Sequence, residues 1–250
     1  MANTHPVSQI KALTFDVFGT VVDWRKSIAQ EIKSVGIAKG FILDWNGFAD
    51  EWRAGYGPSM NKVRTGEMGW ANIDTLHRMI LDSLLETYNI SSLSESETQC
   101  LNKAWHRLDP WPDSVEGLTY LKENYIISSL SNGNVALLVN MAKYGGLPWD
   151  TVLSAELVRH YKPDRETYLS TSEFFGLPIE KVMMVAAHKN DLKSARSTGM
   201  RTAYVPRPYE HGLDVEVDRE PEEYIDIIAD DFVDLSKKLT EARETGFIPE

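Results

Sequence analysis

The sequence predicts an α/β protein with a Rossmann-like, doubly wound parallel sheet, on the basis of three observations. Several short apolar runs are nearly continuous instead of alternating with polar residues, which is typical of strands buried on both faces. Helix-like segments separate most of these runs, as they do in a parallel sheet. One long interval near the N-terminus carries helical patterns and no convincing strand, which indicates a helical insertion.

The predicted strands are the apolar runs, and the predicted helices are the amphipathic segments between them. Strands are expected at residues 10–15, 125–130, 181–187, 201–205 and, from a weaker pattern, 224–229. Helices are expected between them, for instance at residues 115–123, 165–175 and 191–198. This alternation predicts one sheet with helices on both sides.

The helical insertion follows the first predicted strand. Its amphipathic segments are rich in Trp, Tyr, Met and Leu and lie at residues 51–64, 72–89 and 94–108. Asp23-Trp24 marks the start, and the prolines of residues 109–112 end the last helix. We therefore expect a core domain made of residues 1–23 and 111–250, with a helical cap at residues 24–110.

The composition limits the partners and the location of the protein. Its 250 residues are 42% hydrophobic and 25% charged, enough for one large domain with an insertion. The net charge of -11 disfavours nucleic acid and anionic membranes as partners, and no apolar run is long enough to span a bilayer. The N-terminus lacks the pattern of a signal peptide. The single cysteine, Cys100, excludes an internal disulfide and fits a reducing cytoplasm.

Polar residues gather where the predicted strands end. Asp16 follows the first strand, and residues 131–134 follow the second. Residues 161–164 precede the third strand, and residues 188–191 follow it. Ligands of open α/β sheets bind at the carboxyl ends of the strands, so these four clusters are expected to form one site.

The motifs in these clusters resemble those of the haloacid dehalogenase superfamily, and most closely its type II 2-haloacid dehalogenases. They are DVFGT at residues 16–20, SNG at 131–133, YKPDRETY at 161–168 and VAAHKNDLKSA at 185–195. Each motif alone is weak, but four in this order, around a helical cap, are strong together. The resemblance implies hydrolysis of small anionic haloacids with release of halide, without metal or cofactor, by a homodimer.

Asp16 is the predicted nucleophile. An acid beside the Gly19-Thr20 turn could also cap that turn, but the resemblance places Asp16 at the position that forms a covalent ester. The phosphatases of the superfamily usually carry a second Asp, which protonates the leaving alkoxide, at the position of Phe18. A halide needs no proton. Those phosphatases also carry a magnesium-binding Gly-Asp pair where this chain has Ala186-Ala187.

The resemblance assigns roles to polar residues of the second and third clusters. Ser131 is expected to bind the substrate carboxylate and Asn132 to hold the halide, although Asn-Gly is also a common turn signal. Lys162 is expected to neutralise the nucleophile and the substrate, since two carboxylates repel each other without a nearby cation. A solvated surface lysine is the alternative reading. Tyr168 matches a tyrosine near the site.

The residue that activates water stays open among three candidates. The counterpart of Asp191 pairs with the lysine and positions water, although Asp191 could also cap a helix. His188 and Asn190 stand where many type II dehalogenases have Asn and Trp. His188 could take over as a base, or it could line the pocket passively.

The cap is expected to supply an arginine over the halide and the substrate carboxylate. Arg53 is the main candidate, with Arg64 and Arg78 as lesser ones, and each could also lie on a solvated helix face. Substrate contacts are further expected for Trp52, Val17 and Phe18. The loop at residues 207–212 could either close the site or form a simple turn.

The sequence therefore predicts a hydrolase that converts small 2-haloacids into 2-hydroxy acids, with fluoroacetate as a possible substrate. The same aspartate could instead act on another C–X bond or on a strained ring. A metal-dependent phosphatase and a scaffold without catalysis are further alternatives. Phe18 and Ala187 count against the phosphatase, and the polar set around Asp16 counts against the scaffold.

Overall fold

The computed structural model describes residues 5–212 and 215–246, which contain a six-stranded sheet in the order β5-β4-β1-β6-β7-β8. Every pair of neighbouring strands in this sheet is parallel. The strands are β1 (Ala12–Phe15), β4 (Ile126–Ser131), β5 (Thr151–Ser154), β6 (Val182–Ala186), β7 (Arg201–Tyr204) and β8 (Ile227–Ile228). This order confirms the predicted doubly wound fold, since it reverses between β1 and β6.

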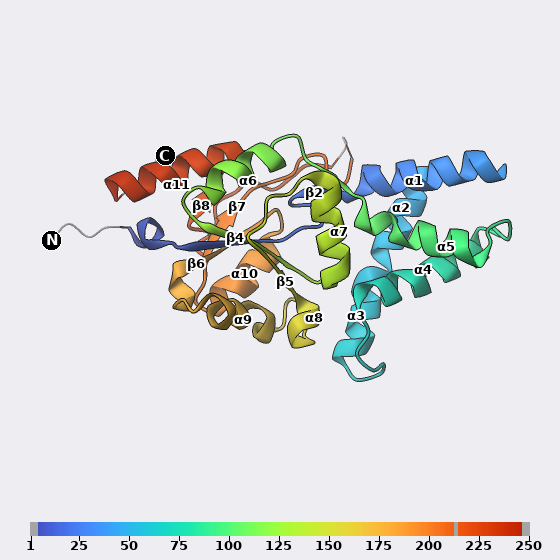
Figure 1. The fold of residues 1–250 in the computed structure, drawn as a ribbon, viewed down its shortest axis with the longest axis horizontal. Helices are drawn as coiled ribbons and strands as arrows, with labels where there is room; N and C mark the ends of the chain where they lie inside the picture. The colour runs from blue at the N-terminus through green and yellow to red at the C-terminus, as the bar shows by residue number, and fades with distance from the viewer. Residues whose placement is uncertain (1–4, 213–214, 247–250) are drawn as a thin grey trace.

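Helices cover both faces of the sheet (Figure 1). On one face lie α6 (Ser114–Lys122) and α11 (Phe232–Thr245), and on the other lie α9 (Arg165–Phe175) and α10 (Lys189–Ser197). Shorter elements of this part are η1 (Pro6–Gln9), α7 (Val135–Gly145), α8 (Ala155–Val158) and η3 (Ile179–Lys181).

The strands carry apolar residues toward both helical layers. Leu13 and Phe15 of β1 pack in the core cluster that includes α6 and α11. Ala12 packs in the second cluster with Tyr168 and Leu192 of α9 and α10. Because successive strand residues point to opposite faces, a strand buried on both faces needs an unbroken apolar run. This is the physical basis of the sequence pattern.

The insertion consists mainly of helices joined by loops and lies to one side of the sheet (Figure 1). A two-stranded antiparallel ribbon, β2 (Val22–Asp23) with β3 (Asp109–Pro110), closes its base. Its helices are α1 (Trp24–Lys39), α2 (Trp45–Ala54), α3 (Tyr56–Arg64), α4 (Ile73–Thr87), α5 (Glu95–Asn102) and η2 (Lys103–His106). The ribbon coincides with the boundaries expected from the sequence. The division into a core domain and a cap stays a prediction.

Two details differ from the expected elements. β5 was not predicted, because it is a short strand at the edge of the sheet whose first residue, Thr151, is exposed. The segment at residues 51–64 is not one helix, since α2 ends at Ala54 and α3 begins at Tyr56. Gly55 lies at the junction and has low helix propensity. Pro58 falls in the first turn of α3, where no intrahelical N–H bond is lost.

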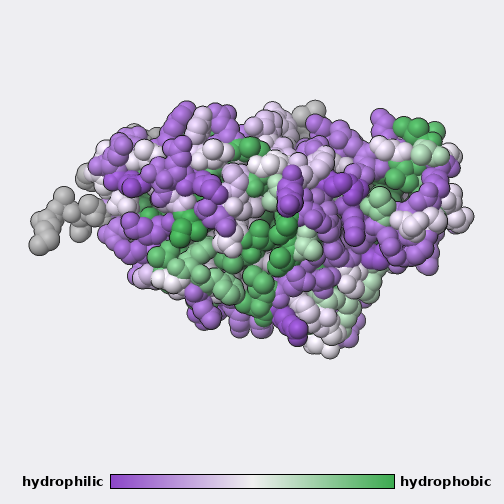
Figure 2. All heavy atoms as spheres, in the orientation of Figure 1, coloured by the Kyte–Doolittle hydropathy of each residue, from purple (hydrophilic) through white to green (hydrophobic). Residues whose placement is uncertain are grey.

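The surface is mostly hydrophilic on the face in Figure 2, with an apolar patch where Figure 1 places β5 and α8. Leu157 of α8 is one of the half-exposed apolar side chains. Within the described ranges, no helix is both long enough and apolar enough to cross a bilayer.

Candidate active site

A cavity of about 390 Å³ opens at the carboxyl ends of β1, β4 and β6, beneath the helical insertion. It lies where the strand order reverses, which is the usual ligand position in this type of sheet. The core and the insertion both contribute side chains. They are Asp16, Phe18, Asn132, Lys162, Pro163, Tyr168, His188, Asn190, Asp191 and Ser194 from the core, with Arg53, Tyr56 and Met60 from the insertion.

Asp16 is the residue directly after β1, and its carboxylate accepts three hydrogen bonds. Lys162 Nζ lies 2.9 Å from Oδ1, and Thr20 Oγ1 lies 2.8 Å from Oδ2. His188 Nδ1 lies 3.0 Å from the same Oδ2. Burial raises the pKa of Asp16, but Lys162 and His188 more than offset this effect and hold it well below its ordinary value. The carboxylate is therefore an anion throughout the neutral range.

Lys162 joins Asp16 to a second carboxylate. Its Nζ lies 2.6 Å from Oδ2 of Asp191, whose Oδ1 accepts a 2.6 Å hydrogen bond from the hydroxyl of Tyr168. Burial lowers the pKa of Lys162, but the two flanking carboxylates raise it above its ordinary value. Burial and the Asp191 charge also raise the pKa of Tyr168, which keeps its proton. Asp191 is not the cap of α10, since that position belongs to His188.

His188 lies between two carboxylates. Its Nδ1 contacts Asp16, and its Nε2 lies 3.0 and 3.1 Å from the two carboxylate oxygens of Glu210. Burial lowers the pKa of His188, but the bonds to Asp16 and Glu210 outweigh this effect and raise it to about 10. Burial likewise raises the pKa of Glu210, and His188 brings it below its ordinary value.

Glu210 is a site residue that the sequence reasoning did not assign. It lies in the loop at residues 207–212, and Arg207 anchors that loop to the core through Asp113 and the backbone oxygen of Thr20. Trp24, the first residue of α1, donates its indole N–H to Glu210 over 3.0 Å. The loop therefore contacts the core and the insertion at once. A lone Glu in a polar loop carries no sequence signal of such a contact.

Asn132 and Ser131 follow β4 but point differently. The Asn132 side chain lines the cavity and accepts the backbone N–H of Lys162 at 2.7 Å. Ser131 is fully buried, and its hydroxyl accepts the backbone N–H of Gly133 at 3.1 Å. Ser131 does not line the cavity, so its expected contact with the substrate carboxylate stays a prediction.

Arg53 is the cationic side chain that the insertion places at the cavity. Its guanidinium carbon lies 4.3 Å from the ring centre of Tyr56 and 5.8 Å from that of Phe18. Its Nη1 is buried and has no hydrogen-bond partner among the described residues. Both lesser candidates are engaged elsewhere, since Arg64 pairs with Asp164 and Arg78 with Asp82 and Glu95.

Three other expected site residues are placed as follows. Asn190 lines the cavity. Trp52 does not, and its expected substrate contact is corrected here: the ring is fully buried against Trp105 and His77, because it points into the core of the insertion. The Val17 side chain is also buried away from the cavity, so any substrate contact would have to come from its backbone.

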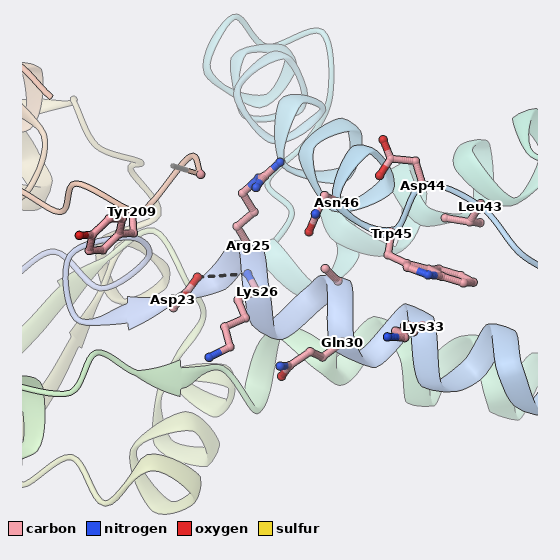
Figure 3. A pocket seen from close by; sticks show the side chains of 12 residues that line it. Asp23, Arg25, Lys26, Gln30, Lys33, Leu43, Asp44, Trp45, Asn46 and Tyr209 are labelled. Atoms are coloured by element: carbon pink, nitrogen blue, oxygen red, sulfur yellow. Dashed lines mark hydrogen bonds between the residues drawn. The ribbon is translucent and has the colours of Figure 1, made fainter. Parts of the chain in front are cut away.

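A second hollow of about 500 Å³ lies beside the start of α1 and α2 (Figure 3). Its lining includes Arg25, Lys26 and Trp45, with Tyr209 on the opposite side. Arg25 is already paired with Asp50. None of the individual residues to which the sequence analysis assigns a catalytic or substrate-binding role lines this hollow, so the cavity at Asp16 is the candidate site.

Among the described residues, the acidic and histidine side chains at the cavity do not form a recognisable metal site. Over residues 5–212 and 215–246, no group of three or more His, Cys, Asp or Glu side chains has the arrangement of a metal site. Ala186, the last residue of β6, and Ala187, which follows it, carry no oxygen on their side chains. Ala187 instead donates its backbone N–H to Thr20.

The contacts of His188 predict that part of the folding stability depends on pH. Its folded pKa, about 10, exceeds the value of roughly 6.5 for an unfolded histidine, so the native state holds the proton over this range. This contribution is complete below about pH 6.5 and is lost as the pH rises toward 10. In urea denaturation, the advantage of wild type over His188→Asn should shrink across this range. A pH-independent difference would contradict the assignment.

Comparison with known proteins identifies the family. A family model described as haloacid dehalogenase-like hydrolase matches residues 10–199. (S)-2-haloacid dehalogenase 4A of Burkholderia cepacia is 27% identical over 205 residues, which are 80% of this chain and 85% of that protein. The chain belongs to the haloacid dehalogenase-like hydrolases, as its motifs indicated.

Solved structures place the chain near one branch of this family. The crystal structure of the defluorinating L-2-haloacid dehalogenase Rha0230 is 44% identical, with a TM-score of 0.89, and the match covers 92% of this chain and 95% of that one. The L-2-haloacid dehalogenase PA0810 is 41% identical, with a TM-score of 0.86 and coverages of 92% and 99%. The likeness therefore spans the core and the insertion alike.

Proposed function

We propose that this protein hydrolyses small 2-haloacids to 2-hydroxy acids through an ester on Asp16. One observation carries the proposal: a buried, ionised Asp16 faces a cavity that also contains Lys162 and Arg53. Phe18 occupies the position at which a phosphatase would need an acid to protonate its leaving group. A carboxylate can displace halide from carbon, and the halide leaves without a proton. The similarity to haloacid dehalogenases supports the same reaction.

The first step is the attack of an Asp16 oxygen on C2 of the haloacid, opposite the halogen. Lys162 offsets the repulsion between the Asp16 and substrate carboxylates. The unpartnered Nη1 of Arg53 and the amide of Asn132 are donors for the departing halide or the substrate carboxylate. Phe18 and Tyr56 keep the reacting carbon in apolar surroundings.

The second step is the hydrolysis of the ester. Water attacks the carbonyl carbon of Asp16, and the bond breaks between that carbon and the ester oxygen that Asp16 has bonded to C2. This oxygen leaves as the hydroxyl of the product. The first step inverts C2, and the second does not touch it. The product therefore has inverted configuration.

We extend the proposal to fluoroacetate. The C–F bond is harder to break than C–Cl, so fluoride needs a close and strongly donating cradle. A buried guanidinium nitrogen without another partner is such a donor. The 44% identical relative is itself described as defluorinating, which supports the extension.

The proposal also includes action without a metal ion, a homodimer, a cytoplasmic location and a cap role for the insertion. Ala187, which stands where the related phosphatases carry a magnesium-binding Asp, supports metal independence. Arg53 and Tyr56 at the cavity support the cap role. The homodimer and the cytoplasmic location rest on the resemblance to the family. Light scattering on purified protein measures the oligomeric state.

Halide release tests the function. Chloroacetate, fluoroacetate and each enantiomer of 2-chloropropionate are incubated with the enzyme in EDTA, and halide and hydroxy acid are measured. We expect release from chloroacetate, fluoroacetate and (S)-2-chloropropionate, with (R)-lactate as the product of the last. Retained configuration would exclude the ester route. Release that requires magnesium would exclude metal independence, and no release from any haloacid would move the assignment to another C–X or strained-ring substrate.

A further inference from the structure

We propose that Asp74, on α4 of the insertion, is a positioning residue that fixes Arg53 relative to Asn132. The inference rests on the proposed function, in which these two side chains are donors for the departing halide or the substrate carboxylate. Arg53 comes from α2 of the insertion, and Asn132 is the residue directly after β4. Their separation therefore depends on how the insertion is attached to the core. Donors supplied by two parts of the chain stabilise a leaving group only when both are held in place.

Asp74 binds the loop that carries Asn132. Its backbone N–H donates to Oδ1 of Asn134 over 3.2 Å, and its Oδ2 accepts a hydrogen bond from the Asn134 amide at 3.1 Å. Asn134 is buried, lies two residues after Asn132 and is the N-cap residue of α7. Two hydrogen bonds in opposite directions fix both the position and the orientation of Asn134. They tie the Asn132 loop to the first turn of α4.

The other carboxylate oxygen of Asp74 reaches α7 through a histidine. His106 Nε2 lies 2.9 Å from Oδ1 of Asp74, and the Asn140 amide lies 3.0 Å from Nδ1 of His106. Asn140 belongs to α7, which lies on the side of the sheet toward the insertion (Figure 1). Because an amide nitrogen only donates, Nδ1 of His106 accepts and Nε2 donates to Asp74. Both oxygens of Asp74 and both ring nitrogens of His106 have partners, and a network satisfied in this way is rigid.

The helix α4 extends this attachment to Arg53. The indole N–H of Trp52, the neighbour of Arg53 on α2, donates to the backbone oxygen of His77 over 2.9 Å. His77 lies three residues after Asp74, within one turn of α4, and both Trp52 and His77 are fully buried. α4 therefore holds Arg53 at one point and the Asn132 loop at another. This arrangement also gives Trp52 a role, although its ring does not line the cavity.

The test exchanges the two side chains of the Asp74–Asn134 pair. Asp74→Asn sets two amide groups against each other, so that one donor loses its acceptor. Asn134→Asp instead sets two carboxylates against each other, and they repel. In the double variant, the amide at position 74 donates to the carboxylate at position 134, and its oxygen still accepts from His106. Every contact of the pair can then form again.

The readout is kcat/KM from halide release with chloroacetate and with bromoacetate. Each single variant should lose roughly tenfold on chloroacetate and less on bromoacetate, because the poorer leaving group depends more on well-placed donors. The double variant should return to within about threefold of wild type on both substrates, since the two substitutions are coupled. Asp82→Asn removes an exposed carboxylate from the same helix and is the matched control, which should behave as wild type.

The ratio of the two kcat/KM values distinguishes positioning from a structural role. A purely structural role would lower the melting temperature and both values together, with no change in their ratio. An unchanged ratio, wild-type activity in both single variants, or a double variant no more active than the weaker single variant would overturn the inference. Failure of wild type to release any halide would instead reject the proposed function, so the two failures are distinguishable.

Discussion

Asp16→Asn is expected to lower halide release from 2-haloacids by at least about 10⁴-fold. The amide oxygen is a much weaker nucleophile than the carboxylate, so no ester forms. The fold should persist, because asparagine is nearly the same size as aspartate and its one side-chain oxygen can still accept the hydrogen bond of Lys162. The measurement is kcat/KM from chloride release, beside a thermal melt of the variant.

Asp226→Asn is the matched control for this loss. Its carboxylate is equally buried and pairs with Arg196 and Arg201, but it contacts Thr202 near the amino end of β7, far along the sheet from the cavity. We expect it to lose stability and keep activity. Undiminished chloride release from a mass-verified Asp16→Asn protein would refute the covalent route. A lag followed by activity would instead reveal deamidation back to aspartate.

Lys162→Met is expected to lower kcat/KM by roughly 10³-fold or more, since the variant leaves Asp16, Asp191 and the substrate carboxylate without their shared cation. Lys162 also helps to hold the pKa of Asp16 low. Without it that pKa rises, so the acid limb of kcat/KM should move to higher pH. The pH dependence of chloride release from chloroacetate measures both effects.

Stability provides an independent check on the same pair. The depressed pKa of Asp16 contributes stability above its unfolded value, and this contribution is lost as the pH falls below it. Lys162→Met should therefore reduce the loss of stability on acidification. Lys193→Met, an exposed lysine on α10, serves as the control and should match wild type. If the acid limb of kcat/KM did not shift in Lys162→Met, the role of Lys162 in keeping Asp16 charged would be contradicted.

The sequence by itself determined the parallel sheet and most of the residues of the site. The strands at residues 10–15, 125–130 and 181–187 were predictable because burial on both faces demands a continuous apolar run. Asp16, Lys162 and the residues after β6 were predictable because parallel strands present their carboxyl ends at one edge. The structure brings these residues together around one cavity.

The tertiary structure alone decided which of these side chains face the cavity and what holds them. Glu210 reaches His188 from a loop 22 positions away, through contacts that no local pattern encodes. Trp52 turns into the core of the insertion although its neighbour Arg53 lines the cavity, because one residue along a helix rotates the side chain by about 100°. Periodicity identifies a helix and its apolar stripe, but the packing partner sets the register, and that partner is distant in sequence.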